Sequence, residues 1–188
     1  MSKLWPKKIN IIAENDPHAE DGVSFHMEDQ KGRQLASLVF SKDQEPGMKK
    51  NDHHEVRFKL IQESGMTLEF APTEADALCV VWGTETEFPA ECPKAPMPRD
   101  PIFYAEKSNG NTLVAINTNP GKKKFNFTLN FVDPHSSTPH KLIPYDPPGD
   151  NQDGGEDRFE TDNLFSTNTV LVGVAAIALI GILYLALR

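Results

Sequence analysis

Apolar and polar residues alternate along several short segments of this chain, which is the pattern of half-buried β-strands. Residues 23–28, 55–61 and 66–70 follow this two-residue period. The most regular segment is residues 125–132, where phenylalanine and leucine occupy one face and asparagine and threonine occupy the other. Glycine, proline and asparagine interrupt the chain between these segments, so the pattern predicts short strands joined by turns.

This pattern predicts nine or ten short strands and no soluble amphipathic helix. Residues 72–77 predict a single helical turn. The unbroken apolar run at residues 78–82 predicts a central strand covered on both faces, and residues 142–145 predict a short edge strand, because a proline cannot donate to a ladder. This spacing favours a mainly β domain, an antiparallel β-sandwich that is immunoglobulin-like in the loose sense, with a closed barrel as the alternative. The Cys-Trp-Cys spacing of antibody domains is absent.

A proline-rich loop interrupts the strand pattern between residues 88 and 101, with five prolines in 14 residues. It contains two PxxP spacings, a pattern that can dock into the aromatic grooves of partner proteins. Pro93, Pro96, Pro98, Arg99 and Pro101 are therefore the candidate residues of a partner-binding loop. The interpretation favoured for this segment is a stiff loop that only crosses one end of the domain.

The apolar run at residues 170–187 contains 18 residues and no charge. As a helix it is about 27 Å long, near the minimum needed to cross the hydrocarbon core of a bilayer. A core helix would keep a polar face, whereas only the hydroxyl of Tyr184 interrupts this one. We therefore expect one transmembrane helix from Val170 to Leu187, in which Gly173 and Gly181 are small residues without GxxxG spacing.

These features divide the chain into a β domain at residues 1–145, an acidic flexible tether at residues 146–169 and a membrane span at residues 170–187. Between Asp146 and Asp162 seven acidic residues stand against one arginine, a net charge of −6. No N-terminal export signal is seen, so we expect a tail-anchored protein whose domain lies on the cytoplasmic side of the membrane.

Composition and motifs argue against several classes of function. The chain carries 27 acidic and 19 basic residues, a net charge of −8, so we expect no nucleic-acid binding. Cys79 lies in an apolar run and is expected to be buried. Cys92 lies in the proline-rich loop, and the sequence does not decide whether the two cysteines form a disulfide bond. Phosphate-binding loops, nucleophile elbows and zinc-protease motifs are absent, so we expect neither a cofactor nor an enzyme.

Histidines are the remaining candidates for chemistry. His53 and His54 are adjacent, so on a strand they point to opposite faces and cannot share a metal ion. We expect both to be solvated at the end of a charged loop. His135 and His140 flank a turn and could meet across it, but a zinc site needs three or four convergent ligands. We therefore expect no metal site.

The favoured hypothesis is a single-pass membrane protein whose β-sandwich acts as a protein-interaction or adaptor module near the membrane surface. Its partners would be the lipid bilayer and an unidentified protein. One alternative is a metal-dependent or other enzyme that uses the turn between His135 and His140. Another is a structural membrane subunit that assembles with copies of itself into a homo-oligomer.

Overall fold

The computed structural model describes residues 2–41, 45, 47–49, 52–89, 99–118, 122–138 and 141–152. Five predictions fall wholly or partly outside these residues. They concern Pro93, Pro96 and Pro98 of the binding loop, the acidic tether beyond residue 152, the whole predicted membrane span, Cys92 and its bridge, and the turn that ends at His140.

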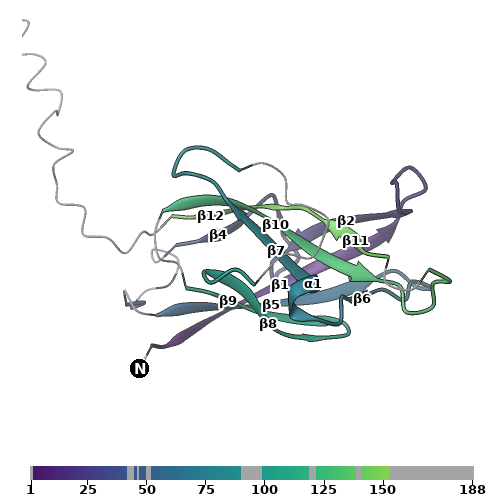
Figure 1. The fold of residues 1–188 in the computed structure, drawn as a ribbon, viewed down its shortest axis with the longest axis horizontal. Helices are drawn as coiled ribbons and strands as arrows, with labels where there is room; N and C mark the ends of the chain where they lie inside the picture. Colours follow the sequence, from purple (N-terminus) through teal and green to yellow (C-terminus); the bar gives the residue numbers. More distant parts are fainter. Residues whose placement is uncertain are drawn as a thin grey trace, which may run out of the picture. The chain divides into compact units, whose positions relative to one another are not determined.

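The described residues are mainly β, in two sheets of mixed strand orientation (Figure 1). Sheet A has the strand order β3-β2-β1-β5-β9-β8. In sheet B, the strand β10 pairs with β6, β7, β11 and β12. Strand β12 also pairs with β4. The strands of sheet A are β1 (Leu4–Asn15), β2 (Val23–Glu28), β3 (Gln34–Leu35), β5 (His53–Gln62), β8 (Phe103–Asn109) and β9 (Thr112–Asn117). Those of sheet B are β4 (Leu38–Phe40), β6 (Glu69–Phe70), β7 (Leu78–Trp82), β10 (Lys123–Val132), β11 (Ile143–Tyr145) and β12 (Pro148–Asn151), and the helix α1 (Glu74–Ala77) precedes β7.

Two strand pairs are parallel, so the expectation of purely antiparallel sheets is wrong. Strand β1 runs parallel to β5, and β12 runs parallel to β4. The other described pairs are antiparallel. Alternation of apolar and polar residues defines the buried face of a strand but is the same for both directions, so the sequence pattern could not separate them.

The first strand, β1, extends well beyond the short segment at residues 9–12 that its apolar residues indicate. It pairs with β5 from Leu4 onward but with β2 only from Asn10. The exposed Pro6 therefore lies where one edge of β1 has no partner among the described strands. A proline is tolerated there because it need not donate to a second ladder.

The apolar run at residues 78–82 forms β7, which pairs only with β10 among the described strands. The expectation of a central strand is therefore wrong, although Leu78, Cys79 and Val80 are all buried as predicted. The short helix α1 confirms the predicted helical turn. Thr73 caps it by accepting a hydrogen bond from the backbone N–H of Asp76 (3.2 Å).

Apolar side chains from both sheets share one core in which phenylalanine predominates. The ring of Phe125 on β10 lies 5.6 Å from that of Phe103 on β8 and 5.8 Å from that of Phe127. The ring of Phe58 on β5 lies 6.1 Å from Phe127. These centroid distances are typical of favourable aromatic pairs. The apolar face predicted for residues 125–132 is thus confirmed as the side of β10 that faces sheet A.

Strand β12 lies inside the range that the sequence assigned to the tether, so the predicted domain boundary at residue 145 is too early. Gly149 is opposite Phe125 on β10 and opposite Leu38 on β4. A Cβ atom on Gly149 would come within 2.1 Å of the Phe125 ring. The glycine that looked like a linker residue is therefore required by close packing of a strand against an aromatic ring.

A buried polar group closes the core near the start of β1 and β5. The carboxylate of Asp52 accepts hydrogen bonds from the backbone N–H groups of Lys3 (2.8 Å) and Lys49 (3.0 Å) and from Nε1 of Trp5 (3.0 Å). These donors, with the Lys49 backbone contributing most, lower the pKa of Asp52 to about 2. Asp52 therefore joins the N-terminal strand to the loop before β5.

His54 lies at the same end of the core, where it is 1% exposed and its ring is 5.0 Å from that of Phe40. Neither ring nitrogen hydrogen-bonds to a residue that the structure describes. Burial, followed by the positive charges of Lys7 and His53, lowers its pKa to about 4. The prediction that His53 and His54 point to opposite faces is confirmed, but the prediction of a solvated position is wrong for His54.

This depressed pKa makes the stability of the domain sensitive to mild acid. Between pH 6.5 and 4 the unfolded chain binds a proton at His54 that the folded chain does not bind, so stability falls as the pH decreases. We expect the loss over this range to be about 2 kcal/mol larger for the native chain than for His54→Phe. Urea unfolding of both chains across this pH range measures the difference. Equal pH dependence would contradict a neutral buried imidazole.

Candidate functional site

The C-terminal flank of the proline-rich loop is fixed by Asp100. One carboxylate oxygen accepts hydrogen bonds from the backbone N–H groups of Ile102 (2.8 Å) and Phe103 (2.8 Å). The other oxygen accepts a hydrogen bond from Nε1 of Trp82 (2.9 Å) on β7. Hydrogen bonds to an ionised acceptor are stronger than neutral ones, so this carboxylate holds the loop exit against sheet B and the start of β8.

Two residues of the predicted binding loop, Arg99 and Pro101, lie on this fixed flank and are exposed. The guanidinium of Arg99 stacks on the ring of Tyr104, 3.9 Å from its centroid, which is a cation–π contact. Asp100 lies between Arg99 and Pro101 in the sequence, and its carboxylate accepts the hydrogen bonds from Ile102, Phe103 and Trp82. The second PxxP spacing, residues 98–101, therefore takes part in contacts of the fold itself.

The N-terminal flank of the loop is fixed by a tight turn after β7. Gly83 allows this turn, because a Cβ atom there would come within 2.2 Å of the carbonyl oxygen of Glu87. The carbonyl oxygen of Pro89 accepts a hydrogen bond from Nδ2 of Asn126 on β10 (3.1 Å). Phe88 is 46% exposed, and Nζ of Lys124 lies 4.7 Å above its ring.

Both flanks of the loop are therefore held by the neighbouring strands β7 and β10, in which Trp82 is opposite Phe125. Residues 90–98 lie between them and outside the described residues. A segment whose ends are already positioned loses less conformational freedom when it binds. The arrangement suits a loop that presents proline-rich residues to a partner.

The turn at His135 does not assemble a recognisable catalytic centre from the described residues. His135 is exposed, and its backbone N–H donates to the carboxylate of Asp133 (2.9 Å). A nearby groove of about 430 Å³ is lined by Glu69, Asp133 and Ser136 among others, but His135 does not line it. His140 lies outside the described residues, so the pairing of the two histidines is not tested.

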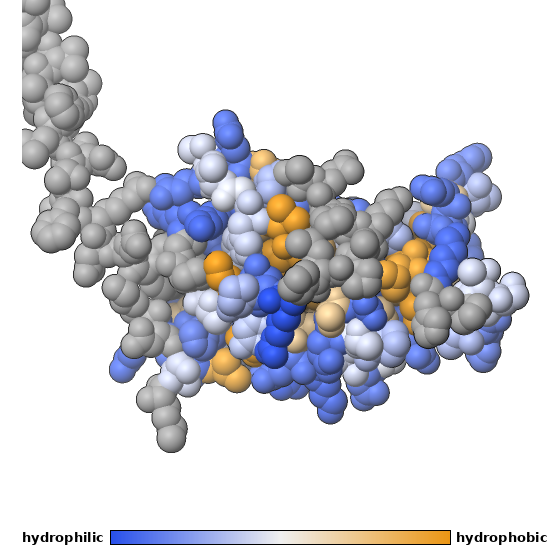
Figure 2. Space-filling model, in the orientation of Figure 1, coloured by the Kyte–Doolittle hydropathy of each residue, from blue (hydrophilic) through white to orange (hydrophobic). Residues whose placement is uncertain are grey.

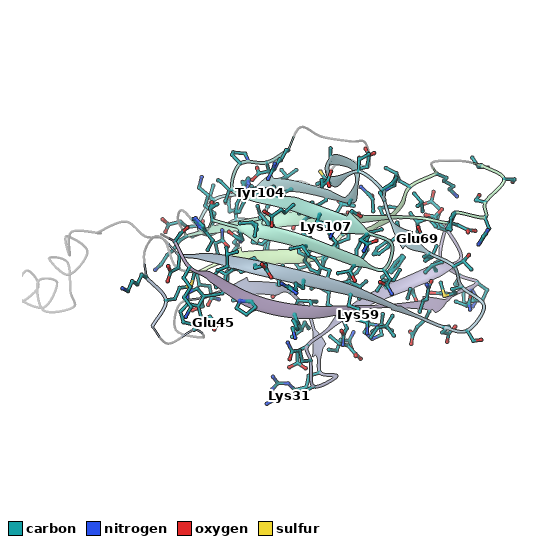
Figure 3. All side chains as sticks on the ribbon, turned by 90° about the horizontal axis from the view of Figure 1, so that it is seen from below. Lys31, Glu45, Lys59, Glu69, Tyr104 and Lys107 are labelled. Carbon is teal, nitrogen blue, oxygen red and sulfur yellow. The ribbon has the colours of Figure 1, made fainter. Side chains whose placement is uncertain are left out.

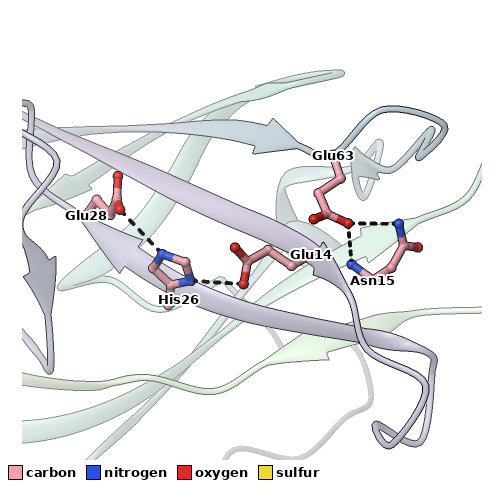
Figure 4. Close-up of polar contacts among 5 residues, drawn as sticks. All are labelled: Glu14, Asn15, His26, Glu28 and Glu63. Atoms are coloured by element: carbon pink, nitrogen blue, oxygen red, sulfur yellow. Dashed lines mark hydrogen bonds and ion pairs between the residues drawn. The ribbon is translucent and has the colours of Figure 1, made fainter.

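On the outer face of sheet A, His26 lies between the carboxylates of Glu14 and Glu28 (Figure 4). Nε2 of His26 lies 3.4 Å from Glu28 and its Nδ1 lies 4.0 Å from Glu14. The two carboxylates approach opposite ring nitrogens, so they could not bind one metal ion together with the imidazole. Within the described ranges, no group of three or more His, Cys, Asp or Glu side chains is placed to hold a metal ion.

A shallow depression on the outer face of sheet A was not predicted from the sequence. It has a volume of about 210 Å³ and lies beside Lys59, which is labelled in Figure 3. The polar side chains that line it can all donate hydrogen bonds: Lys8, Asn10, Gln30, Arg57, Lys59 and Thr112. These residues come from β1, β5, β9 and the turn after β2, so only the strand register brings them together.

The visible surface in Figure 2 is mostly hydrophilic, with small separate apolar patches. In the part of the chain that the structure describes, no helix is long and apolar enough to cross a membrane. The predicted span at residues 170–187 lies outside that part. Comparison with models of protein families and with curated proteins finds no match to this chain.

Proposed function

We propose that this chain is a single-pass membrane protein whose β domain presents a proline-rich segment to a protein partner near the bilayer. In this proposal the domain is a β-sandwich, immunoglobulin-like in the loose sense, on the cytoplasmic side. Residues 170–187 form the transmembrane helix. The shared aromatic core of the two sheets supports the sandwich, and the uncharged length of residues 170–187 supports the span.

The observation that carries the binding role is the fixation of both loop flanks. Asp100 binds Trp82 at one end, and Asn126 binds the carbonyl oxygen of Pro89 at the other. These contacts fix the exit and the entry of the loop. A proline-rich segment gains affinity from them, because less entropy is lost on docking.

The tether in this proposal begins after Gln152, because β12 belongs to sheet B. Seventeen residues then separate the domain from Val170. As a flexible coil they span roughly 20–25 Å. The domain would stay near the membrane, which raises its effective concentration toward partners in the same membrane.

Alkaline carbonate extraction tests the membrane anchor. We expect the full chain to remain in the membrane pellet and a chain ending at residue 169 to appear in the supernatant. Protease treatment of intact cells without an outer wall tests the sidedness, and the domain should be protected. Release of the full chain by carbonate would contradict the anchor, and digestion of the domain would contradict the cytoplasmic location.

Site-specific photo-crosslinking in native membranes tests the binding segment. A crosslinking residue at position 95 should give a defined adduct with one protein, and Pro93→Ala with Pro96→Ala should reduce its yield at least fivefold. Pro17→Ala, in the exposed turn between β1 and β2, is the matched control and should leave the yield unchanged. An adduct that is insensitive to both changes would refute the proline-rich segment as the binding element.

A further inference from the structure

The depression on the outer face of sheet A concentrates positive charge in a chain that is acidic as a whole. Its lining includes the cations Lys8, Arg57 and Lys59 and no acidic residue. Lys8 and Arg57 are directly opposite each other on β1 and β5. The strand register therefore holds two cations side by side on the outer face of sheet A.

Part of this charge is not neutralised by the protein. Lys8 and Lys59 form no ion pair with any residue that the structure describes. Arg57 donates through Nε to the carboxylate of Glu55 (2.5 Å), whose side chain is 14% exposed. A second carboxylate, that of Glu28, is directly opposite Asn10 in the strand register. The three cations exceed these two carboxylates by about one charge, so the depression favours an anion.

The turn after β2, at the rim of the depression, is held in place by Asp29. The Asp29 carboxylate accepts hydrogen bonds from the backbone N–H groups of Lys31 (2.8 Å) and Arg33 (3.0 Å) and lies 2.6 Å from the Arg33 guanidinium. A second hollow of about 470 Å³ shares Lys8 and Gln30 with the first, and Asp29, Lys31 and Arg33 also line it. Figure 3 shows Lys31 at the tip of the turn that projects from the strands.

The other lining groups suit the same ligand. Asn10 and Gln30 carry amide N–H donors, and Lys59 lies between Asn10 and Thr112 in the strand register. A tetrahedral oxyanion can accept several hydrogen bonds at once from donors on different strands.

We propose that this depression is a binding site for a phosphate group, carried by a soluble phosphate compound or by a phospholipid headgroup. The inference is independent of the proline-rich loop and of the membrane anchor, because it depends only on described residues of sheet A. The site is open to solvent, so charge screening limits its affinity. A dissociation constant for inorganic phosphate of about 1 mM is expected at low ionic strength, and it rises with salt.

Nuclear magnetic resonance of the full chain in nonionic detergent micelles tests the site with inorganic phosphate as the probe. The backbone amides of Asn10, Arg57 and Thr112 should shift saturably with phosphate and not with chloride at equal ionic strength. The variant Lys8→Gln with Lys59→Gln should bind phosphate at least tenfold more weakly. The control Lys122→Gln with Lys123→Gln removes the same charge at exposed positions beside and in β10 and should bind like the native chain.

A second experiment distinguishes the source of the phosphate group. The full chain is placed in nanodiscs of phosphatidylcholine alone or with phosphatidic acid. Shifts of the same amides that need phosphatidic acid indicate a headgroup ligand, whereas shifts in the phosphate titration alone indicate a soluble one. The proposal is overturned if neither experiment gives saturable shifts, or if both lysine pairs weaken binding equally.

Discussion

Replacing Phe125 with alanine is expected to lower the free energy of unfolding by about 4 kcal/mol, because a large aromatic side chain is removed from a closed core. Its ring lies 5.0 Å from Trp82, 5.6 Å from Phe103 and 6.1 Å from Phe40, so both sheets lose contacts at once. Urea unfolding of the full chain in nonionic detergent, followed by tryptophan fluorescence, measures the change.

A double-mutant cycle with Gly149 makes this prediction specific. Gly149→Ala alone should cost about 3 kcal/mol, because the new Cβ atom overlaps the Phe125 ring. Combined with Phe125→Ala, the added methyl group fills space that the ring vacated, so the double variant should be about 2 kcal/mol more stable than additivity predicts.

Gly22→Ala is the matched control for the glycine substitution. Gly22 has a positive φ of 73° and no atom near its missing Cβ, so only backbone strain of about 1 kcal/mol is expected, additive with Phe125→Ala. Additive losses at Gly149 as well would contradict the close contact between β12 and the Phe125 ring.

Replacing Asp100 with alanine is expected to cost about 3 kcal/mol of stability and to reduce crosslinking from position 95. The change removes three hydrogen bonds to one carboxylate and leaves the N–H group of the buried Phe103 unpaired. Asp100→Asn keeps one carbonyl oxygen for the two backbone donors, so an intermediate loss is expected. Urea unfolding and the crosslinking yield provide the two measurements.

Asp16→Ala is the matched control for Asp100. Asp16 also accepts a backbone hydrogen bond through its side chain, from His18 (2.9 Å), but in an exposed turn. We expect a loss of about 0.5 kcal/mol and no change in crosslinking. A chain with Asp100→Ala that keeps native stability and native crosslinking would show that the fixed flank does not support the loop.

Local features of this fold could be read from the sequence because they depend on neighbouring residues. The alternation at residues 55–61 and 125–132 identified the inward faces of β5 and β10, and the proline at position 144 was consistent with the short strand β11. The buried position of Cys79 followed from its apolar neighbours. These predictions are confirmed by the structure.

Pairing between distant strands could not be predicted in this way. The sequence pattern does not indicate that β1 and β5 run parallel. Pro148 and Gly149 are residue types common in linkers, so the pattern did not predict the strand β12 that contains them. The net charge of the chain did not predict the positive charge of the depression around Lys8. The cations that line this depression come from separate segments of a chain that is acidic as a whole. The fixed flanks of the proline-rich loop depend on Asp100 contacting Trp82, which the spacing of prolines does not reveal.

The parallel pairing of β12 with β4 has a consequence for how the domain is synthesised. Leu38 pairs with Gly149, so the ladder between β4 and β12 cannot form until residue 149 has been synthesised. Most of the chain must therefore exist before sheet B is complete. Pairing across such a separation carries a large loop-closure cost and slows folding. Before β12 pairs with β10, Gly149 does not cover the ring of Phe125. Exposed apolar surface promotes aggregation, so we expect the pairing of β12 to protect a newly synthesised chain from aggregation.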